Sequence, residues 1–360
     1  MDPVERTVRV FYPPVDAAVR LRTEDDWARD VEPVAVEQDG ACHVFRLRLE
    51  RPFLYLKPVL RRGDDVRWSA GDNVLIVAAF DQVPRDVYPY FLAPVRCSEA
   101  DLHEVPSRDG SRSHACRVYL PPGYAENTLQ RFPVAYMQDG HNLFFPQEAA
   151  QGQTWRVRET LERLTTMNQT TEMIVVGVQP EDRMEDYTKP GYEAYGRFLA
   201  HDLKPLVDSR YRTLPEASST AVIGSSLGGV VSMYLAWEHP SVFGMAACLS
   251  STFGHKDDLR DRVAEEPRRD VRLYLDSGFP SDNFEVTKQL AATLLERGWR
   301  FGQDLLYLAF PEGVHREAAW ATRLHIPFQF LFGATRQLRL ANVGGSGGKV
   351  ASPARSPRRR

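Results

Sequence analysis

The pattern of apolar and polar residues changes character once along this chain, near residue 91. Before that point, apolar and polar residues alternate with a period of two in short segments, at 7–12, 43–49 and 53–60. Such alternation is typical of half-buried antiparallel strands. The turn sequences at 38–40 and 62–65 separate these segments. We therefore predict a small β-sandwich domain over residues 1–95.

Beyond the sandwich, continuous apolar runs alternate with amphipathic segments. This regular alternation predicts a mostly parallel sheet with helices on both faces, and hence an α/β domain over residues 96–335. The Gly-, Ser- and Arg-rich residues 336–360 predict a disordered tail. The expected strands are 134–137, 173–178, 221–223, 246–249, 271–275 and 305–308, and the expected helices are 154–167, 194–209, 227–239, 283–297 and 320–332.

A Gly-x-Ser-x-Gly turn joins one of these strands to the helix after it. The turn is residues 224–228, after the apolar strand that ends at Ile223 and before the apolar helical segment 230–237. Strand, turn and helix in this order form the nucleophile elbow of α/β-hydrolases. The elbow predicts that Ser226 presents its hydroxyl above the sheet, at the positive end of the helix. The alternative reading is an ordinary Gly/Ser loop.

A serine nucleophile needs a histidine base, and the histidine needs a carboxylate that orients it. His315 follows the last predicted strand and precedes the terminal helix, which is the position of the histidine base in the α/β-hydrolase fold. We favour it over the three other histidines that follow Ser226, namely His239, His255 and His325.

Two aspartates compete for the role of the acid. Asp276 comes directly after the predicted strand 271–275, and its alternative role is to brace the turn. Asp282 precedes the helix that begins at Asn283, so its alternative role is an N-cap. We favour Asp282 and keep Asp276 as the alternative acid.

An ester hydrolase of this kind also needs donors for the oxyanion of the tetrahedral intermediate. The first expected donor is the backbone N–H of Leu227, directly after the nucleophile. The second is expected from the loop after the strand 134–137, where Gly140 permits a turn and the N–H of His141 is the best candidate.

Charge and composition exclude several other classes of protein. The formal net charge of −3 gives no field that would attract nucleic acid or an anionic membrane. The four cysteines form no Cys-x-x-Cys pair, and no His-Glu-x-x-His sequence is present, so we expect neither a disulfide framework nor a metal or other cofactor. No signal peptide or membrane-spanning run is visible, and we expect a cytoplasmic protein.

The α/β part resembles a family of α/β-hydrolases that includes esterase D, feruloyl esterases and enterochelin esterases. The resemblance rests on ordered stretches between residues 108 and 332, at 118–124, 139–144, 183–188, 211–213, 224–229 and 315–320. It implies an esterase whose acid matches Asp282 better than Asp276. It also implies that Trp155, Arg183 and Tyr187 shape the substrate pocket. The family commonly has glutamine where this chain has His141.

The front domain is similar to the immunoglobulin-like modules attached to enterochelin esterases and glycogen-active enzymes. That similarity implies carbohydrate binding or substrate shaping, for which Trp27, Phe53, Tyr55 and Trp68 could supply a stacking surface, although such aromatics more often pack in a core.

The sequence therefore predicts a serine carboxylic ester hydrolase that works through an acyl-enzyme. The alternatives are an acyltransferase with the same triad and a non-catalytic carbohydrate-binding or scaffold protein.

Overall fold

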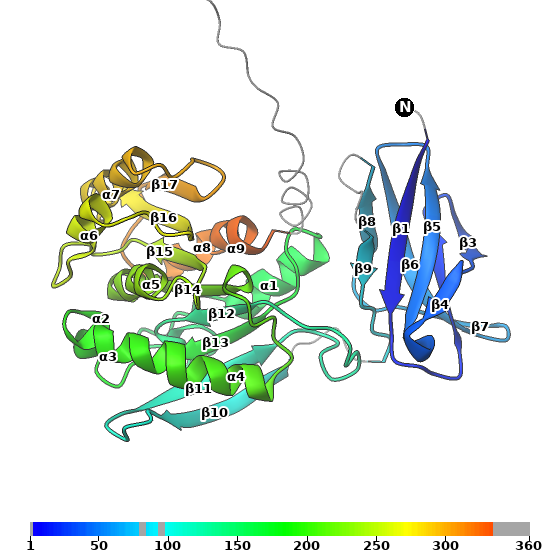
Figure 1. The fold of residues 1–360 in the computed structure, drawn as a ribbon, viewed down its shortest axis with the longest axis horizontal. Helices are drawn as coiled ribbons and strands as arrows, with labels where there is room; N and C mark the ends of the chain where they lie inside the picture. The colour runs from blue at the N-terminus through cyan, green and yellow to red at the C-terminus, as the bar shows by residue number, and fades with distance from the viewer. Residues whose placement is uncertain (1–2, 79–83, 93–97, 334–360) are drawn as a thin grey trace, which may run out of the picture.

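The protein is described by a computed structural model that covers residues 3–78, 84–92 and 98–333, with side chains from residue 104 onward in the last range. The predicted domain boundary at 95/96 and the predicted tail at 336–360 lie outside the described residues, as does Cys97. The chain forms an all-β region followed by an α/β region, side by side in Figure 1.

The all-β region is a sandwich of two sheets. One sheet has the strand order β4-β5-β1-β9, and the other has the order β3-β2-β6-β7 with β8 also paired to β6. Buried residues such as Val10, Leu21, Phe45 and Leu56 fill the space between the sheets, as the alternating pattern requires. The strands are β1 Val4–Phe11, β2 Ala18–Thr23, β3 Asp26–Val31, β4 Ala35–Glu37, β5 Cys42–Leu49, β6 Phe53–Arg62, β7 Asp65–Trp68, β8 Val74–Val77 and β9 Arg85–Val87.

The α/β region is built on an eight-stranded sheet with the order β10-β11-β13-β12-β14-β15-β16-β17. The first two strands of that order pair antiparallel, and the six from β13 to β17 are parallel. The sheet fulfils the predicted fold class. Its strands are β10 Ser98–Pro106, β11 Ser113–Leu120, β12 Val134–Met137, β13 Ile174–Val178, β14 Thr220–Ser225, β15 Met245–Leu249, β16 Arg272–Phe279 and β17 Leu305–Pro311.

Helices cover both faces of this sheet, because alternate residues of each buried strand point to opposite sides. Val222 belongs to the core shared with α3, α4, α5, α6 and α7, whereas its neighbours Ala221 and Ile223 belong to the core shared with α1, α8 and α9. The helices are α1 Val157–Thr166, α2 Arg183–Tyr187, α3 Gly191–Phe198, α4 Lys204–Arg210, α5 Leu227–Glu238, α6 Leu259–Glu265, α7 Phe284–Glu296, α8 Glu317–Arg323 and α9 His325–Phe332.

Several predicted elements differ from the observed ones. The single helix expected at 320–332 is the pair α8 and α9, and the strand expected at 305–308 continues to Pro311. The expected helix 194–209 is a longer unit in which α3 and α4 are joined by the π-helical residues Leu199–Leu203. The strand expected at 271–275 continues to Phe279, because β17 pairs with it as far as Phe279 opposite Pro311. Asp276 therefore lies inside a strand rather than in a loop, a correction that bears on its role.

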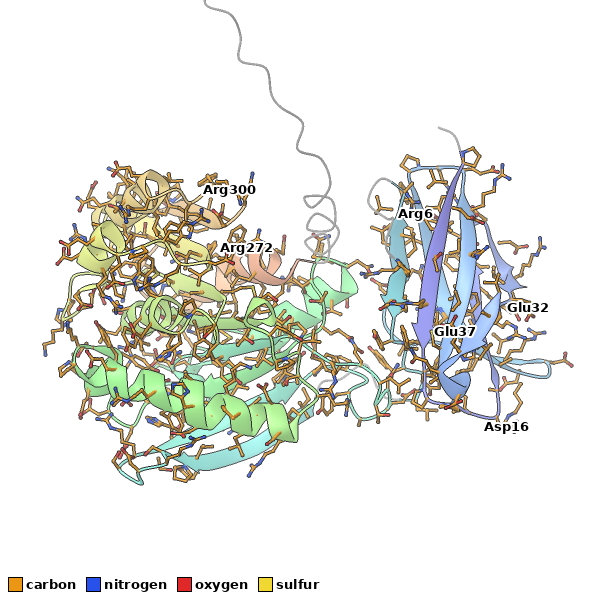
Figure 2. The ribbon with its side chains drawn as sticks, viewed as in Figure 1. Arg6, Asp16, Glu32, Glu37, Arg272 and Arg300 are labelled. Atoms are coloured by element: carbon orange, nitrogen blue, oxygen red, sulfur yellow. The ribbon has the colours of Figure 1, made fainter. Side chains whose placement is uncertain are left out.

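The two regions are joined by a polar interface centred on residues 126 and 127. The buried Asn127 amide donates to the backbone oxygens of Phe11 (2.9 Å) and Pro89 (2.8 Å). Glu126 accepts hydrogen bonds from the Tyr12 hydroxyl (2.8 Å) and from the backbone N–H of Phe91. These contacts fix the sandwich to the α/β region, whereas the labelled Asp16 and Glu32 lie on the side of the sandwich that faces away from it (Figure 2).

In the part of the chain that the structure describes, no helix is long and apolar enough to cross a membrane.

Candidate active site

Ser226 lies in a sharp turn between β14 and α5. Its backbone has φ 56° and ψ −124°, a strained conformation for a residue with a side chain. The turn is so tight that a Cβ at position 224 would come within 2.3 Å of the Gly228 carbonyl oxygen. Residues 220–237 are otherwise buried, and Ser226 alone among them is partly exposed. The predicted elbow geometry is thus present.

His315 and Asp282 meet at the same edge of the sheet, in the loops after β17 and β16. The Nδ1 of His315 lies 2.7 Å from Oδ1 of Asp282. The imidazole is 40% exposed, whereas the carboxylate is 2% exposed. The two loops approach closely because residues 278 and 313 are glycines; a Cβ at position 278 would lie 2.2 Å from the Gly313 oxygen.

The second oxygen of Asp282 is held from the protein interior. It accepts hydrogen bonds from the Ser250 hydroxyl (2.5 Å) and from the backbone N–H of Gly278 (3.1 Å). Burial alone would raise the pKa of Asp282, but the hydrogen bonds from His315, Ser250 and Gly278 hold that pKa below its ordinary value. Asp282 is therefore an ionised partner for His315 at neutral pH. It does not cap α7, whose N-cap residue is Asn283.

The Ser250 hydroxyl has its direction fixed by two donors. Its oxygen accepts from Nε1 of Trp320 (3.0 Å) and from Nη2 of Arg323 (2.7 Å). A hydroxyl has one hydrogen and two acceptor positions. Because both acceptor positions are occupied by N–H donors, the single hydrogen of Ser250 points to Asp282.

Asp276, the alternative acid, is engaged elsewhere. It is fully buried in β16, where its carboxylate accepts from Nη2 (2.9 Å) and Nε (3.1 Å) of Arg323 and from the Tyr274 hydroxyl (2.8 Å). The Arg323 guanidinium therefore links Asp276 to Ser250, one step behind Asp282. The structure brings Asp282 to His315, and it brings Asp276 to an arginine.

Two backbone N–H groups are free near the elbow. Neither the N–H of Leu227 nor that of His141 donates a hydrogen bond in the described part of the chain, because each opens a helical turn. The turn at 139–141 lies against the elbow, since a Cβ at Gly228 would be 3.2 Å from Oδ2 of Asp139. The sequence predicts these two groups as oxyanion donors.

The three predicted pocket residues take different positions. Arg183 lines a cleft of about 520 Å³ together with Ser226, and it pairs with both carboxylate oxygens of Asp139 at 2.8 and 3.0 Å. Tyr187 is fully buried, and its hydroxyl oxygen accepts from the Asp139 N–H (2.9 Å). Trp155 is also buried, 5.8 Å from Trp320 between ring centroids. The remaining cleft residues are Leu227, Thr252, Phe253, Gly254, His255 and Asn283.

Sequence reasoning missed Ser250 and Arg323, because no motif marks either residue. Their contacts arise only when β15, β16 and α8 are packed together. No group of three or more metal-ligating side chains occurs within the described ranges.

Comparison with known proteins shows the family to which this chain belongs. Residues 108–328 match the protein family described as "Putative esterase". The chain belongs to this family. It is therefore a carboxylic ester hydrolase, and small-molecule esters are its class of substrate.

Two relatives show what the chain is similar to in sequence. The chain is 26% identical over 244 residues to "Uncharacterized protein YbbA" of Bacillus subtilis (strain 168), covering 61% of this chain and 92% of the relative. It is 23% identical over 203 residues to an "Endo-1,4-beta-xylanase/feruloyl esterase" of Xylanibacter ruminicola, covering 55% of this chain and 27% of that protein.

The solved structures show that the fold is shared. A ferulic acid esterase is similar with a TM-score of 0.55 and 18% identity, covering 66% of this chain and 98% of the other. The ferric enterobactin esterase of Salmonella typhimurium has a TM-score of 0.53 and 13% identity, covering 91% of this chain and 93% of the other.

Proposed function

We propose that this esterase acts through a Ser226–His315–Asp282 triad and an acyl-enzyme intermediate. The 2.7 Å contact between His315 and the buried, ionised Asp282, at the sheet edge that also carries the elbow, is the observation on which the proposal depends. The free N–H groups of Leu227 and His141 support it, because they can receive the oxyanion.

The chemistry follows from these positions. His315 takes the proton of the Ser226 hydroxyl while the oxygen forms a bond to the ester carbonyl carbon. The tetrahedral intermediate collapses, the bond to the alcohol oxygen breaks, and His315 gives its proton to the leaving alcohol. Water then loses a proton to His315 and attacks the acyl-enzyme. When this second tetrahedral intermediate collapses, the bond to the Ser226 oxygen breaks, His315 returns the proton to that oxygen, and the acid is released.

Hydrolysis is favoured over acyl transfer to an alcohol because the imidazole of His315 is 40% exposed. Water can therefore reach the base throughout the cycle. The partition is measured by comparing hydrolysis with alcoholysis of one p-nitrophenyl ester in the presence of an added alcohol. A dominant alcoholysis product at low alcohol concentration would replace our assignment with the acyltransferase.

The decisive experiment is labelling by a fluorophosphonate probe. We expect one site of labelling that disappears in Ser226→Ala and persists in Ser225→Ala, a matched variant of the neighbouring serine. Absence of labelling in folded protein would instead favour the non-catalytic scaffold. A p-nitrophenyl ester series then measures the acyl-chain preference, while cell fractionation tests the predicted cytoplasmic location.

We also propose carbohydrate contact by the front domain. Trp68 is 40% and Phe53 43% exposed, and each lies beside a second aromatic ring, Trp27 and Tyr55 respectively. Adjacent exposed rings provide stacking surfaces for sugars. Retention on glycogen or starch, lost in Trp68→Ala, is the expected result; equal retention of wild type and variant would exclude this surface.

A further inference from the structure

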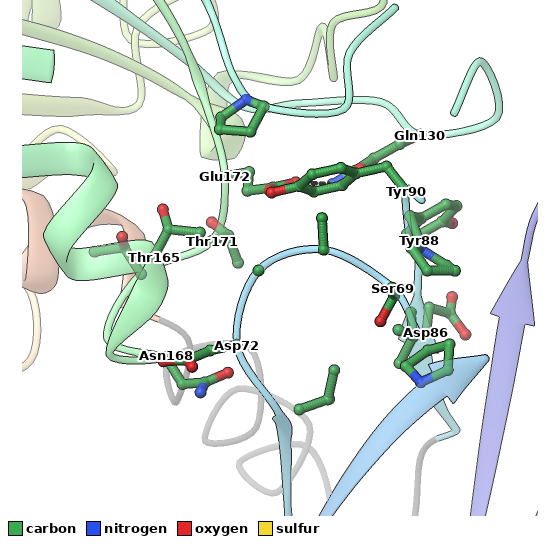
Figure 3. Close-up of a pocket in the computed structure, with 18 of the residues that line it drawn as sticks. Ser69, Asp72, Asp86, Tyr88, Tyr90, Gln130, Thr165, Asn168, Thr171 and Glu172 are labelled. Carbon is green, nitrogen blue, oxygen red and sulfur yellow. Dashed lines mark hydrogen bonds between the residues drawn. The ribbon is translucent and has the colours of Figure 1, made fainter. Parts of the chain in front are cut away.

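A cavity of about 700 Å³ lies between the sandwich and the α/β region. Figure 3 shows its walls, with Ser69, Asp72 and Tyr90 from the sandwich facing Asn168 and Glu172 of the α/β region. Glu172 lies just before β13, at the amino ends of the parallel strands, whereas the candidate triad follows their carboxyl ends. The cavity is therefore separate from the esterase cleft. Its volume is in the range of small-molecule sites.

Glu172 has no cation among the described residues to balance its charge. Its carboxylate accepts one hydrogen bond, from Nε2 of Gln130 at 3.0 Å, and among the described residues it forms no ion pair. Burial raises the pKa of Glu172 to about 7, which the Gln130 bond only partly opposes. A carboxylate in this position destabilises the free protein, and a bound cation would remove the penalty.

The other charged groups around the cavity do not supply that cation. Asp86 is paired with Arg9 at 2.7 Å. Arg131 donates to the Thr213 backbone oxygen at 3.2 Å. Asp72 has Lys57 as a nearby charge, and Glu126 is held at the interface. Arg85 and Glu162 have partners of their own.

Tyr90 lies near Glu172 in the wall of the cavity (Figure 3), and its ring lies against position 123, where a Cβ would come within 2.4 Å of it. Burial raises the pKa of the Tyr90 hydroxyl, and the charges of Glu172 and Glu126 raise it further. The hydroxyl is therefore neutral. It can donate or accept a hydrogen bond, and the ring can face a cation.

Ser69 provides an independent indication that the cavity receives a polar ligand. Its hydroxyl forms no hydrogen bond with any described residue, stays accessible to solvent and points into the cavity (Figure 3). A ligand that fills the cavity would displace water from this hydroxyl and would have to replace the lost hydrogen bond. Hydroxyl and amide groups that both donate and accept hydrogen bonds also line the cavity, on Gln130, Thr165, Asn168 and Thr171.

We propose that this cavity binds a small hydroxylated primary amine. The ammonium group would pair with Glu172 beside the Tyr90 ring, and the ligand's hydroxyls would satisfy Ser69 and the amides. An anionic ligand would meet the unbalanced carboxylate, and an apolar ligand would leave both Glu172 and Ser69 without partners. The proposal does not depend on the esterase mechanism.

The test compares 4-amino-1-butanol with 1,4-butanediol, which differ in one charge, and with maltose as a neutral sugar. Binding to the full chain is measured by calorimetry and by the melting temperature. We expect binding of the amino alcohol alone at about pH 8. Protonation of a carboxyl with a pKa near 7 should weaken that binding about 30-fold at about pH 5.5, in proportion to its ionised fraction.

Two variants locate the site. Glu172→Gln should weaken amine binding at least about 10-fold, the loss of one charge-assisted contact. Glu159→Gln, an exposed glutamate on α1 outside the cavity, is the matched control and should leave binding unchanged. Binding that survives Glu172→Gln, equal binding of the diol or maltose, or no binding of the amino alcohol would each overturn the proposal.

Discussion

Replacement of Ser250 by alanine tests how the acid of the candidate triad is held. The hydroxyl donates to Asp282 and accepts from Trp320 and Arg323, at 2.5, 3.0 and 2.7 Å. Ser250→Ala removes the donor to a buried carboxylate and leaves the Trp320 N–H without its acceptor. Ser250 is not among the residues that line the cleft, and its hydroxyl reaches Asp282, so it acts through Asp282 as a positioning residue.

The expected magnitudes follow from these contacts. A hydrogen bond to a charged group contributes about 1.5–3 kcal/mol, and a buried donor left unpaired costs about 1–3 kcal/mol. Because both losses fall on one network, we expect a decrease of about 3 kcal/mol in the free energy of unfolding. If about 1.4 kcal/mol of it affects the orientation of His315, kcat falls about 10-fold. KM should stay near its wild-type value.

The assay is steady-state hydrolysis of p-nitrophenyl acetate, run well below the melting temperature and beside urea denaturation. Ser251→Ala is the matched control, because Ser251 is equally buried but its hydroxyl has no hydrogen-bond partner among the described residues. That change should be neutral or stabilising and leave kcat intact. An unchanged kcat in folded Ser250→Ala, or the same loss in Ser251→Ala, would refute the reasoning.

Three further predictions follow from the same geometry. Asp282→Asn should lower kcat by about 10³–10⁴, whereas Asp276→Asn should act mainly on stability and lower the free energy of unfolding by about 3–5 kcal/mol, because it breaks a buried pair with Arg323; a loss of kcat of that size in Asp276→Asn and not in Asp282→Asn would make Asp276 the acid. Glu172→Gln should stabilise the protein by up to about 3 kcal/mol at about pH 8 and by nothing near pH 4, because a folded-state pKa of about 7 removes stability as the pH rises from the unfolded value toward 7; melting curves that differ equally at both pH values would contradict it. Gly224→Ala should prevent folding of the elbow, since its Cβ would lie 2.3 Å from a backbone oxygen; a soluble variant that a fluorophosphonate still labels would show that the turn tolerates a side chain.

The fold was predictable because its signals are local. Alternation with a period of two marked the sandwich, and apolar runs between amphipathic segments marked the parallel sheet, with most element ends correct to a few residues. The strand predicted at 271–275 was too short, because Asp276 reads as a turn residue in the sequence, whereas β16 continues to Phe279. The burial of Asp276 depends on Arg323, which lies 47 residues further along the chain.

The candidate site was predictable in part for the same reason. Ser226, His315 and the turn at 139–141 each sit beside a recognisable strand end, so their shared location follows from the topology. The choice between Asp276 and Asp282 did not follow, since both residues come near the end of one strand. Only the packing of α8 against β15 and β16 assigns an arginine to the first and leaves the second for His315.

The candidate triad lies at the carboxyl ends of the parallel strands, and the cavity with Glu172 lies at their amino ends. The described residues that line the esterase cleft all belong to the α/β region, and the sandwich meets that region at the opposite edge, where Glu172 lies. A sandwich in this position does not form a wall of the esterase cleft. The sandwich contributes instead its exposed aromatic rings and one wall of the cavity. Both sites can therefore be removed by mutation without touching Ser226, Asp282 or His315, and each hypothesis can fail without the other.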